Sequence, residues 1–199
     1  YERLRAQYDR FMLRTMAVRG ERLHFAEGHW SDEAGNQTAV LLLAEVDDDG
    51  RICYHGSFDQ EDFESAYREL ERRYYSGEGA DYAQPGAMSM KLMAAANRGE
   101  FDRILAEMSI PGLRFENMSR SVFPDRTPDE LRASLEELGT MVAATREWFA
   151  AVRWLSPNWF VGRHDREGLG KGGERYSWTR LYAGEIRGGL VRAICEFDV

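Results

Sequence analysis

The sequence predicts an α+β protein built from two related units in tandem, of which the first is incomplete. Residues 42–59 resemble residues 182–198, and residues 23–35 resemble residues 158–170, so the same piece occurs twice. In both copies, strand-like segments follow one another with short turn signals between them, which is typical of an antiparallel meander. The first copy lacks its beginning, and the second stops where the first continues into a helix.

Four segments of the first copy are rich in β-branched and aromatic residues and are expected to be strands, at residues 11–19, 23–30, 39–46 and 51–58. Turn-forming residues join them, and Asp49-Gly50 between the last two is a strong hairpin signal. Residues 1–8 have the pattern of the last turns of a helix. The first copy is therefore predicted to be an antiparallel meander that follows the end of a helix.

A helix is expected to follow this meander. Asp59 is a candidate N-cap, and Glu61 and Asp62 lie in the first turn, where acidic groups favour the positive end of the helix dipole. Apolar residues then recur at helical spacing, at Phe63, Ala66, Tyr67, Leu70 and Tyr74. This pattern ends near Gly77, and one face of the helix should be buried.

Residues 77–86, with their Gly, Ala, Asp and Pro, indicate a linker between a partial unit at residues 1–76 and a second unit at residues 87–199. The second unit is expected to contain two helices, a strand, a third helix and four strands, at residues 88–97, 101–108, 113–118, 127–138, 145–154, 158–166, 174–185 and 190–197. Thr127, Pro128 and Glu130 mark the start of the third helix as a capping box.

The composition excludes some classes of function. The 199 residues carry a net charge of -8, which argues against binding to nucleic acid because phosphates require a basic face. No segment approaches the roughly 18 uninterrupted apolar residues of a membrane span. The four His and two Cys lack ligand spacing, so neither a metal nor another cofactor is expected. The chain begins with Tyr1 rather than Met and has no signal peptide, so we expect a fragment of a cytoplasmic protein.

The order of elements in the second copy resembles the cystatin-like α+β cone of nuclear transport factor 2, ketosteroid isomerase, scytalone dehydratase and the SnoaL-like polyketide cyclases. Residues 46–52 and 58–74 look like one subgroup, the SnoaL-like modules at the C-termini of actinobacterial multidomain regulators, which often carry a cyclase-like or LuxR-type region and an ATPase. Residues 97–102 look like the bend between the first two helices of such cones. The resemblance implies a curved sheet covered by helices, with an outer face used for dimerisation.

Enzymes of the family resembled place acidic, His or Tyr side chains inside the cone, and Asp102, Glu116 and His164 are the corresponding candidates here. Strand alternation puts Phe115 and Asn117 on one face and Glu116 on the other. Since Phe115 is expected to point inward, Glu116 should face solvent or partners beside Arg114.

The neighbouring residues His164 and Asp165 point to opposite faces of a strand and should not pair directly. His29 and His164 occupy matching places in the two copies, which favours a structural role for His164. No catalytic set is therefore predicted from the motifs themselves.

Large aromatic side chains crowd the second meander. Alternation places Trp148, Ala150, Val152 and Trp154 on one face of their strand, and Tyr176, Trp178 and Tyr182 on one face of theirs. These aromatic residues either fill the interior, line a pocket for a flat apolar ligand, or form a contact with another copy. The candidate ligand pocket comprises Phe115, Asn117, Trp148, Val152, Tyr176, Trp178 and Tyr182.

The sequence favours a non-catalytic module of a larger cytoplasmic regulator. Such a module would bind a small apolar molecule, or would mediate homodimerisation or contact other domains of the same protein. The alternative is an isomerase, dehydratase or cyclase that acts on a polyketide- or steroid-like substrate in the second copy. A buried carboxylate or His facing an open pocket would distinguish this enzyme from the module.

Overall fold

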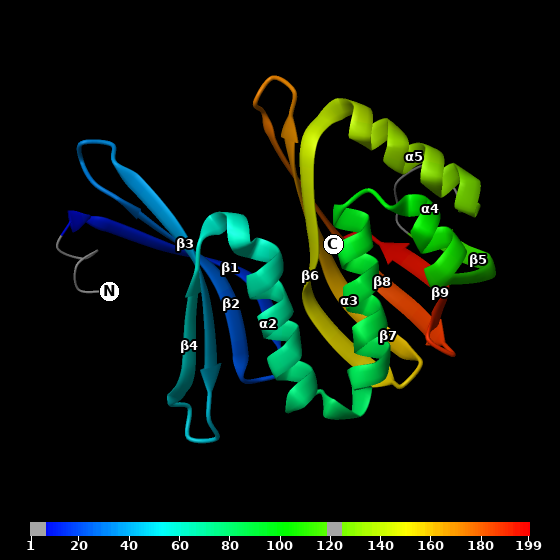
Figure 1. Ribbon diagram of the computed structural model, residues 1–199, viewed down its shortest axis with the longest axis horizontal. Coiled ribbons are helices and arrows are strands. Elements are labelled where there is room, and N and C mark those ends of the chain that lie inside the picture. Colours follow the sequence, from blue (N-terminus) through cyan, green and yellow to red (C-terminus); the bar gives the residue numbers. More distant parts are fainter. Residues whose placement is uncertain (1–6, 119–124) are drawn as a thin grey trace. The chain divides into compact units, whose positions relative to one another are not determined.

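The computed structural model describes residues 7–118 and 125–199, and the chain forms two compact units, Tyr1–Ala80 and Asp81–Val199. Both are mixed α+β and contain antiparallel meanders, as the sequence predicts (Figure 1). Most of the helix expected at residues 1–8 lies outside the described residues, although Gln7 is helical. Among the described residues, no helix combines the length and the apolar character needed to cross a bilayer.

The first unit has one four-stranded antiparallel sheet, with its strands in sequence order: β1 (Arg10–Arg19), β2 (Leu23–Ser31), β3 (Gln37–Val46) and β4 (Ile52–Phe58). Each strand begins and ends within two residues of its predicted bounds. The predicted hairpin at Asp49-Gly50 forms because Gly50 has a φ of 74° and the Asp47 carboxylate accepts the Asp49 and Arg51 N–H groups at 3.0 and 2.9 Å.

Helix α2 (Phe63–Ser76) lies across this sheet (Figure 1) and buries the predicted apolar stripe. The prediction that Asp59 caps the helix is wrong, because a 3₁₀ turn at Gln60–Asp62 intervenes and the Asp59 side chain makes no capping hydrogen bond. Phe63 meets Phe25 of β2, with ring centroids 5.6 Å apart. The helix is therefore held by aromatic packing rather than by its cap.

A buried ion pair joins β1 to α2. Arg19 is 0% exposed and donates from Nε to Glu71 at 3.0 Å and from Nη2 to the Tyr67 hydroxyl at 2.7 Å. Burial acts to lower the pKa of Arg19, but the charge of Glu71, the neighbouring Tyr67 and the hydrogen bond to Glu71 together outweigh this effect and raise it. One charged pair whose members satisfy each other is thus buried beside the aromatic packing between the sheet and the helix of the first unit.

In the second unit, α3 (Ala83–Asn97) begins inside the segment proposed as a linker. Pro85 lies in its first turn, where the backbone N–H that proline lacks has no partner within the helix. After a bend come α4 (Phe101–Arg103) and one π turn (Ile104–Met108). The prediction of helix at residues 101–108 is therefore confirmed, with a wider last turn.

Helix α5 (Pro128–Met141) starts at the predicted capping box. The Thr127 N–H donates to the Glu130 carboxylate at 2.8 Å, and the Glu130 N–H donates to the Thr127 hydroxyl at 3.3 Å. Figure 1 shows α3, α4 and α5 on one side of the second sheet.

That sheet has five strands, in the order β5-β9-β8-β7-β6: β5 (Ser109–Asn117), β6 (Val142–Ser156), β7 (Trp159–Gly170), β8 (Arg175–Arg187) and β9 (Leu190–Phe197). Strand β5 runs parallel to β9, and the others form the predicted antiparallel meander. Strand β5 begins four residues before the predicted strand at residues 113–118 and contains Pro111-Gly112 as an irregularity. Gly112 adopts a φ of 80°, and an edge strand tolerates proline.

A bulge at Ala150 of β6 changes which side chains face the helices. Before it, Trp148 lies opposite Asp165, and after it Val152 lies opposite Gly162. Asp165 and Gly162 belong to opposite faces of β7, so the prediction that Trp148, Val152 and Trp154 share a face is wrong. One inserted residue reverses the alternation from that point onward.

Candidate active site in the C-terminal unit

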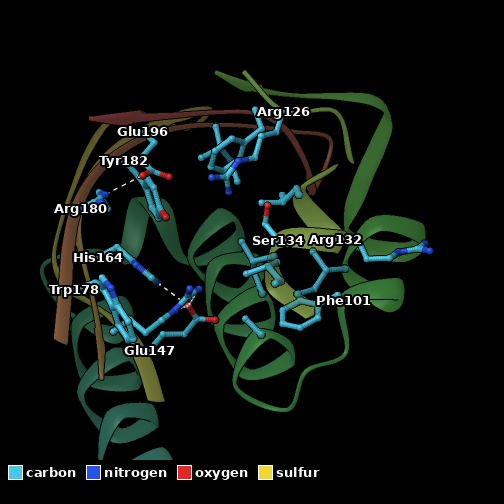
Figure 2. A pocket seen from close by; sticks show the side chains of 18 of the residues that line it. Phe101, Arg126, Arg132, Ser134, Glu147, His164, Trp178, Arg180, Tyr182 and Glu196 are labelled. Carbon is cyan, nitrogen blue, oxygen red and sulfur yellow. Dashed lines mark hydrogen bonds and ion pairs between the residues drawn. The ribbon is translucent and has the colours of Figure 1, made fainter. Parts of the chain in front are cut away.

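A cavity of about 440 Å³ lies between the second sheet and its helices (Figure 2). This volume is within the range of small-molecule sites. The helical wall is largely apolar and contributes Leu92, Met93, Ala96, Phe101, Ile104, Leu105, Leu131, Leu135 and Met141. Phe115 and Ile194 extend this apolar lining onto β5 and β9.

The sheet side of the cavity is polar. Its inward-facing side chains come from four adjacent strands and are Glu147, His164, Arg166, Arg180, Tyr182 and Glu196. The strand register explains why they meet, because His164 lies opposite Arg180 and Tyr182 lies opposite Glu196. Cross-strand partners share a face, so a polar surface forms opposite an apolar helical wall.

Glu147 is 5% exposed and binds two groups of β7. Arg166 donates to it from Nε at 2.8 Å and makes a second contact from Nη2, and His164 Nε2 lies 3.2 Å from the same carboxylate oxygen. Burial alone would raise the pKa of Glu147, but the His164 hydrogen bond and the Arg166 charge lower it to about 2. Glu147 is therefore an anion at neutral pH.

This anion determines the tautomer of His164, which is 5% exposed. A carboxylate can only accept hydrogen bonds, so Nε2 of His164 carries the proton that is donated to Glu147. In the neutral ring, Nδ1 then has a free lone pair. The structure gives Nδ1 no hydrogen-bond partner among residues 7–118 and 125–199.

Tyr182 is a potential donor beside this imidazole. The two rings are 5.0 Å apart, and both side chains extend from neighbouring strands into the cavity (Figure 2). Burial raises the pKa of Tyr182 well above its usual value, so the phenol stays protonated. In the described part of the chain, its hydroxyl has no hydrogen-bond partner.

A second ion pair flanks these two rings. Arg180 Nε donates to Glu196 at 2.9 Å and Arg180 Nη1 donates to the Thr179 carbonyl at 3.0 Å. With Glu147 paired to Arg166, each of these two carboxylates has its own arginine. On the sheet side of the cavity, His164 and Tyr182 are thus left as the groups that can exchange hydrogen bonds with a ligand.

Four of the residues selected from the sequence line the cavity: Phe115, His164, Trp178 and Tyr182. Trp178 stacks on Tyr176 with centroids 5.8 Å apart, but Tyr176 lies beyond the lining and is 45% exposed. The expected alternation of β8 is what brings Trp178 and Tyr182 to the same side.

The remaining selected residues do not line the cavity. Asp102 is exposed and pairs with Arg132 at 2.8 Å, whose head group points away from the cavity in Figure 2. Trp148 is turned to the other face by the β6 register, and Asn117 and Val152 also lie outside the lining.

Glu116 pairs with Arg114 at 3.1 Å, on the face that alternation predicts. As predicted, Asp165 does not bind His164; it accepts from Arg163 at 2.9 Å on the opposite face. Strand alternation was thus sufficient to exclude both carboxylates from the cavity.

Sequence reasoning missed Glu147, Arg166 and Arg180. Arg166 follows His164 by two residues, and alternation could have placed it on the same face. Glu147 could not be found in this way, because its approach to His164 depends on the register between β6 and β7. No group of three or more His, Cys, Asp or Glu side chains in the described part of the chain could hold a metal ion.

A similar histidine–glutamate pair occurs in the first unit. His29 Nε2 lies 3.0 Å from Glu27, which also binds Arg14 and Gln60. The His29 side chain is 41% exposed and does not line the cavity. The pair alone therefore does not make a site; in the second unit, it borders a cavity.

No protein-family model matches the sequence, and no curated protein matches it significantly. Several solved structures resemble the fold. AusH from Aspergillus nidulans is 15% identical with a TM-score of 0.51, covering 57% of this chain and 82% of its own. PrhC from Penicillium brasilianum is 17% identical with a TM-score of 0.52, covering 59% and 81%.

An NTF2-like protein of unknown function from Burkholderia pseudomallei has 13% identity and a TM-score of 0.46, covering 57% of this chain and 88% of its own. At such low identities, the similarity of AusH and PrhC concerns the fold alone. Over 57–59% of its length, the chain shares with AusH and PrhC an α+β fold. In the second unit, this architecture is a mostly antiparallel five-stranded sheet with its helices on one face.

Proposed function

We propose that the C-terminal unit is an acid–base enzyme that moves a proton on a small, largely apolar molecule carrying a carbonyl or hydroxyl oxygen. The observation that carries this proposal is His164 at the cavity wall, with Nε2 fixed by the Glu147 anion and Nδ1 unpartnered in the described residues. A histidine held in this way is a suitable general base.

The reaction follows from the two rings. His164 Nδ1 takes a proton from a carbon next to the substrate carbonyl, and the Tyr182 phenol donates a hydrogen bond to the oxygen that becomes negative. Glu147 stabilises the resulting imidazolium. Return of the proton to another carbon gives isomerisation, and its transfer to a departing hydroxyl gives dehydration. Isomerases and dehydratases are the classes implied by the sequence resemblance.

The lining also suggests the kind of substrate. Two carboxylates and two arginines of the sheet neutralise one another in pairs, which favours an uncharged ligand. Trp178 and Phe101 offer ring faces and edges to a flat apolar body. A cyclic ketone of one or two rings is therefore a suitable probe.

The test is exchange of the α-protons of 2-tetralone in D₂O, followed by NMR. The wild-type protein should accelerate exchange, and His164→Gln should lower the catalysed rate by about 100-fold or more. His29→Gln is the matched control, since His29 has the same type of glutamate partner without the cavity, and it should leave the rate unchanged. Equal rates for the wild type and His164→Gln would overturn the proposal.

Non-catalytic binding, within a larger regulator of the resembled type, is the second candidate. It is favoured by the arginine partners of Glu147 and Glu196, which leave neither carboxylate available as a base. In that case 2-tetralone or 2-naphthol would quench the Trp178 fluorescence without any catalysed proton exchange. The same samples therefore distinguish the two roles.

A further inference from the structure

The side-chain amide of Asn97 binds the backbone of Glu147 at two points. Asn97 Nδ2 donates to the Glu147 carbonyl at 2.8 Å, and the Glu147 N–H donates to Asn97 Oδ1 at 2.7 Å. Asn97 is the last residue of α3, and Glu147 lies fifty positions later on β6. The two hydrogen bonds therefore attach the end of a helix to the strand that carries the buried carboxylate.

This attachment replaces a missing strand. β6 is at the edge of its sheet, and the N–H and C=O of one strand residue point to the same side. At Glu147 that side is the open edge. Its backbone groups would be costly to leave unpaired at a residue that is 5% exposed. A primary amide offers one donor and one acceptor side by side, as a neighbouring strand would.

The place of Asn97 is itself fixed by the end of the helix. Gly99 adopts a φ of 69°, and the Arg98 and Gly99 N–H groups donate to the Ala95 and Ala96 carbonyls at 3.2 and 2.9 Å. The helix thus ends within two residues of Asn97, and its amide points at β6 from a defined position.

We propose that Asn97 is a positioning residue of the candidate site, which fixes the Glu147 backbone and thereby holds its carboxylate against His164 Nε2. The inference rests on the role proposed for His164. Asn97 is not among the residues that line the cavity, so it acts through Glu147 and not by touching a ligand.

The Glu147 carboxylate contacts His164 and Arg166, and the contact with His164 should be the more sensitive to a shift of β6. At 3.2 Å it is close to the limit of a useful hydrogen bond, whereas Arg166 holds the carboxylate from two nitrogens. If the strand shifts by a fraction of an ångström, the carboxylate follows Arg166. His164 then loses the partner that keeps its proton on Nε2.

The substitution leaves the other charged or titratable side chains around Glu147 in the protein. Besides His164, those that border the same cavity are Arg166 on β7, Arg180 and Tyr182 on β8, Glu196 on β9, Arg132 and Glu137 on α5, and Arg126 just before α5. Since Asn97 is neutral, its replacement by alanine alters no charge. A change at His164 would then report geometry.

The test compares Asn97→Ala with Ser109→Ala. The Ser109→Ala variant also loses a hydrogen bond from a buried side chain to the backbone, which the Ser109 hydroxyl donates to the Ile104 carbonyl at 3.0 Å. Ser109 has no link to Glu147. Long-range ¹H–¹⁵N spectra of the ligand-free protein measure the two tautomers of His164. The wild type and Ser109→Ala should favour Nε2–H by roughly tenfold or more, and Asn97→Ala should lose most of this preference.

Catalysed exchange of 2-tetralone should fall about 10- to 100-fold in Asn97→Ala and stay near the wild-type rate in Ser109→Ala. Asn97→Gln keeps the amide on a longer, neutral side chain and should lie between Asn97→Ala and the wild type, which provides a second variant if Asn97→Ala does not fold. An unchanged His164 tautomer in both Asn97 variants would overturn the inference. A changed tautomer in a protein whose wild type catalyses no exchange would uphold the positioning role and refute the proposed function.

Discussion

Replacing Glu147 by glutamine should destabilise the second unit in a strongly pH-dependent way. The partners of Glu147 lower its pKa from 4.5 to about 2 although it is buried. Since one pKa unit corresponds to about 1.4 kcal/mol, the folded state gains on the order of 3 kcal/mol at neutral pH from this ionisation. Removing one partner of a buried pair typically costs about 3–5 kcal/mol, which agrees with this magnitude.

The sign of the pH dependence follows from the lowered pKa. Above pH 4.5, Glu147 is ionised in the folded and the unfolded chain, and the full contribution is present. As the pH falls from 4.5 towards 2, the unfolded chain takes up the proton first, and the contribution is lost. The difference between the wild type and Glu147→Gln should therefore be largest near pH 7 and should shrink below pH 4.5.

Urea unfolding monitored by tryptophan fluorescence measures this difference. Four of the five tryptophans belong to the second unit, and Trp30 belongs to the first, so the signal reports mainly on the second unit. Glu137→Gln serves as the control, because Glu137 also borders the cavity but is exposed, and its effect should stay within about 0.5 kcal/mol. A loss below about 1 kcal/mol at pH 7, or a loss that is the same at every pH, would refute the reasoning.

Three further predictions concern single side chains. Glu71→Gln in the first unit leaves Arg19 buried without its anion and should cost about 3–5 kcal/mol in urea unfolding followed by circular dichroism, and a cost near zero would contradict the pairing. Gly162→Ala would place a Cβ 2.9 Å from the Phe149 ring and should cost about 1–3 kcal/mol in the same assay; a neutral result would mean that the β6–β7 packing is looser than described. Burial raises the pKa of Tyr182, so this phenol should not contribute to the ultraviolet absorbance change of tyrosine ionisation near pH 10. Tyr182→Phe should therefore leave that absorbance change unaltered, and a smaller absorbance change in the variant would show that Tyr182 ionises as an ordinary phenol.

Local patterns were sufficient for most of the fold. The β-branched segments, the Asp49-Gly50 turn and the Thr127–Glu130 capping box each specify their structure through contacts between residues that are close in sequence. The Asp59 cap failed because two helical starts compete within a few residues, and the actual helix begins at Phe63. Sequence alone does not rank such neighbouring starts.

The candidate site depends instead on register between distant segments. The bulge at Ala150 decides which side chains of β6 face the helices. Nothing in the small residues Ala150 and Ala151 distinguishes a bulge from a regular strand. The meeting of Glu147 with His164, and of Asn97 with Glu147, follows from that register. The sequence therefore predicted an aromatic-lined sheet but not the carboxylate that gives His164 its proposed role.

The size of the cavity could not be predicted from local sequence patterns either. Trp178 and Tyr182 lie on the expected face, yet whether aromatic residues fill a cone or line it depends on how far the helices stand from the sheet. In the first unit, apolar side chains such as Phe25 and Phe63, together with the Arg19–Glu71 pair, are buried between sheet and helix.

A long-range ¹H–¹⁵N spectrum of the His164 ring in the wild-type protein, recorded with and without 2-naphthol, tests directly whether Glu147 fixes this ring and a ligand reaches it. We expect the neutral form of the ring to carry its proton on Nε2, and the Nδ1 signal to shift as the ligand saturates the cavity, while the His29 signals stay in place. A neutral ring with its proton on Nδ1 in the free protein, or ligand binding that leaves the His164 signals unmoved, would contradict this expectation.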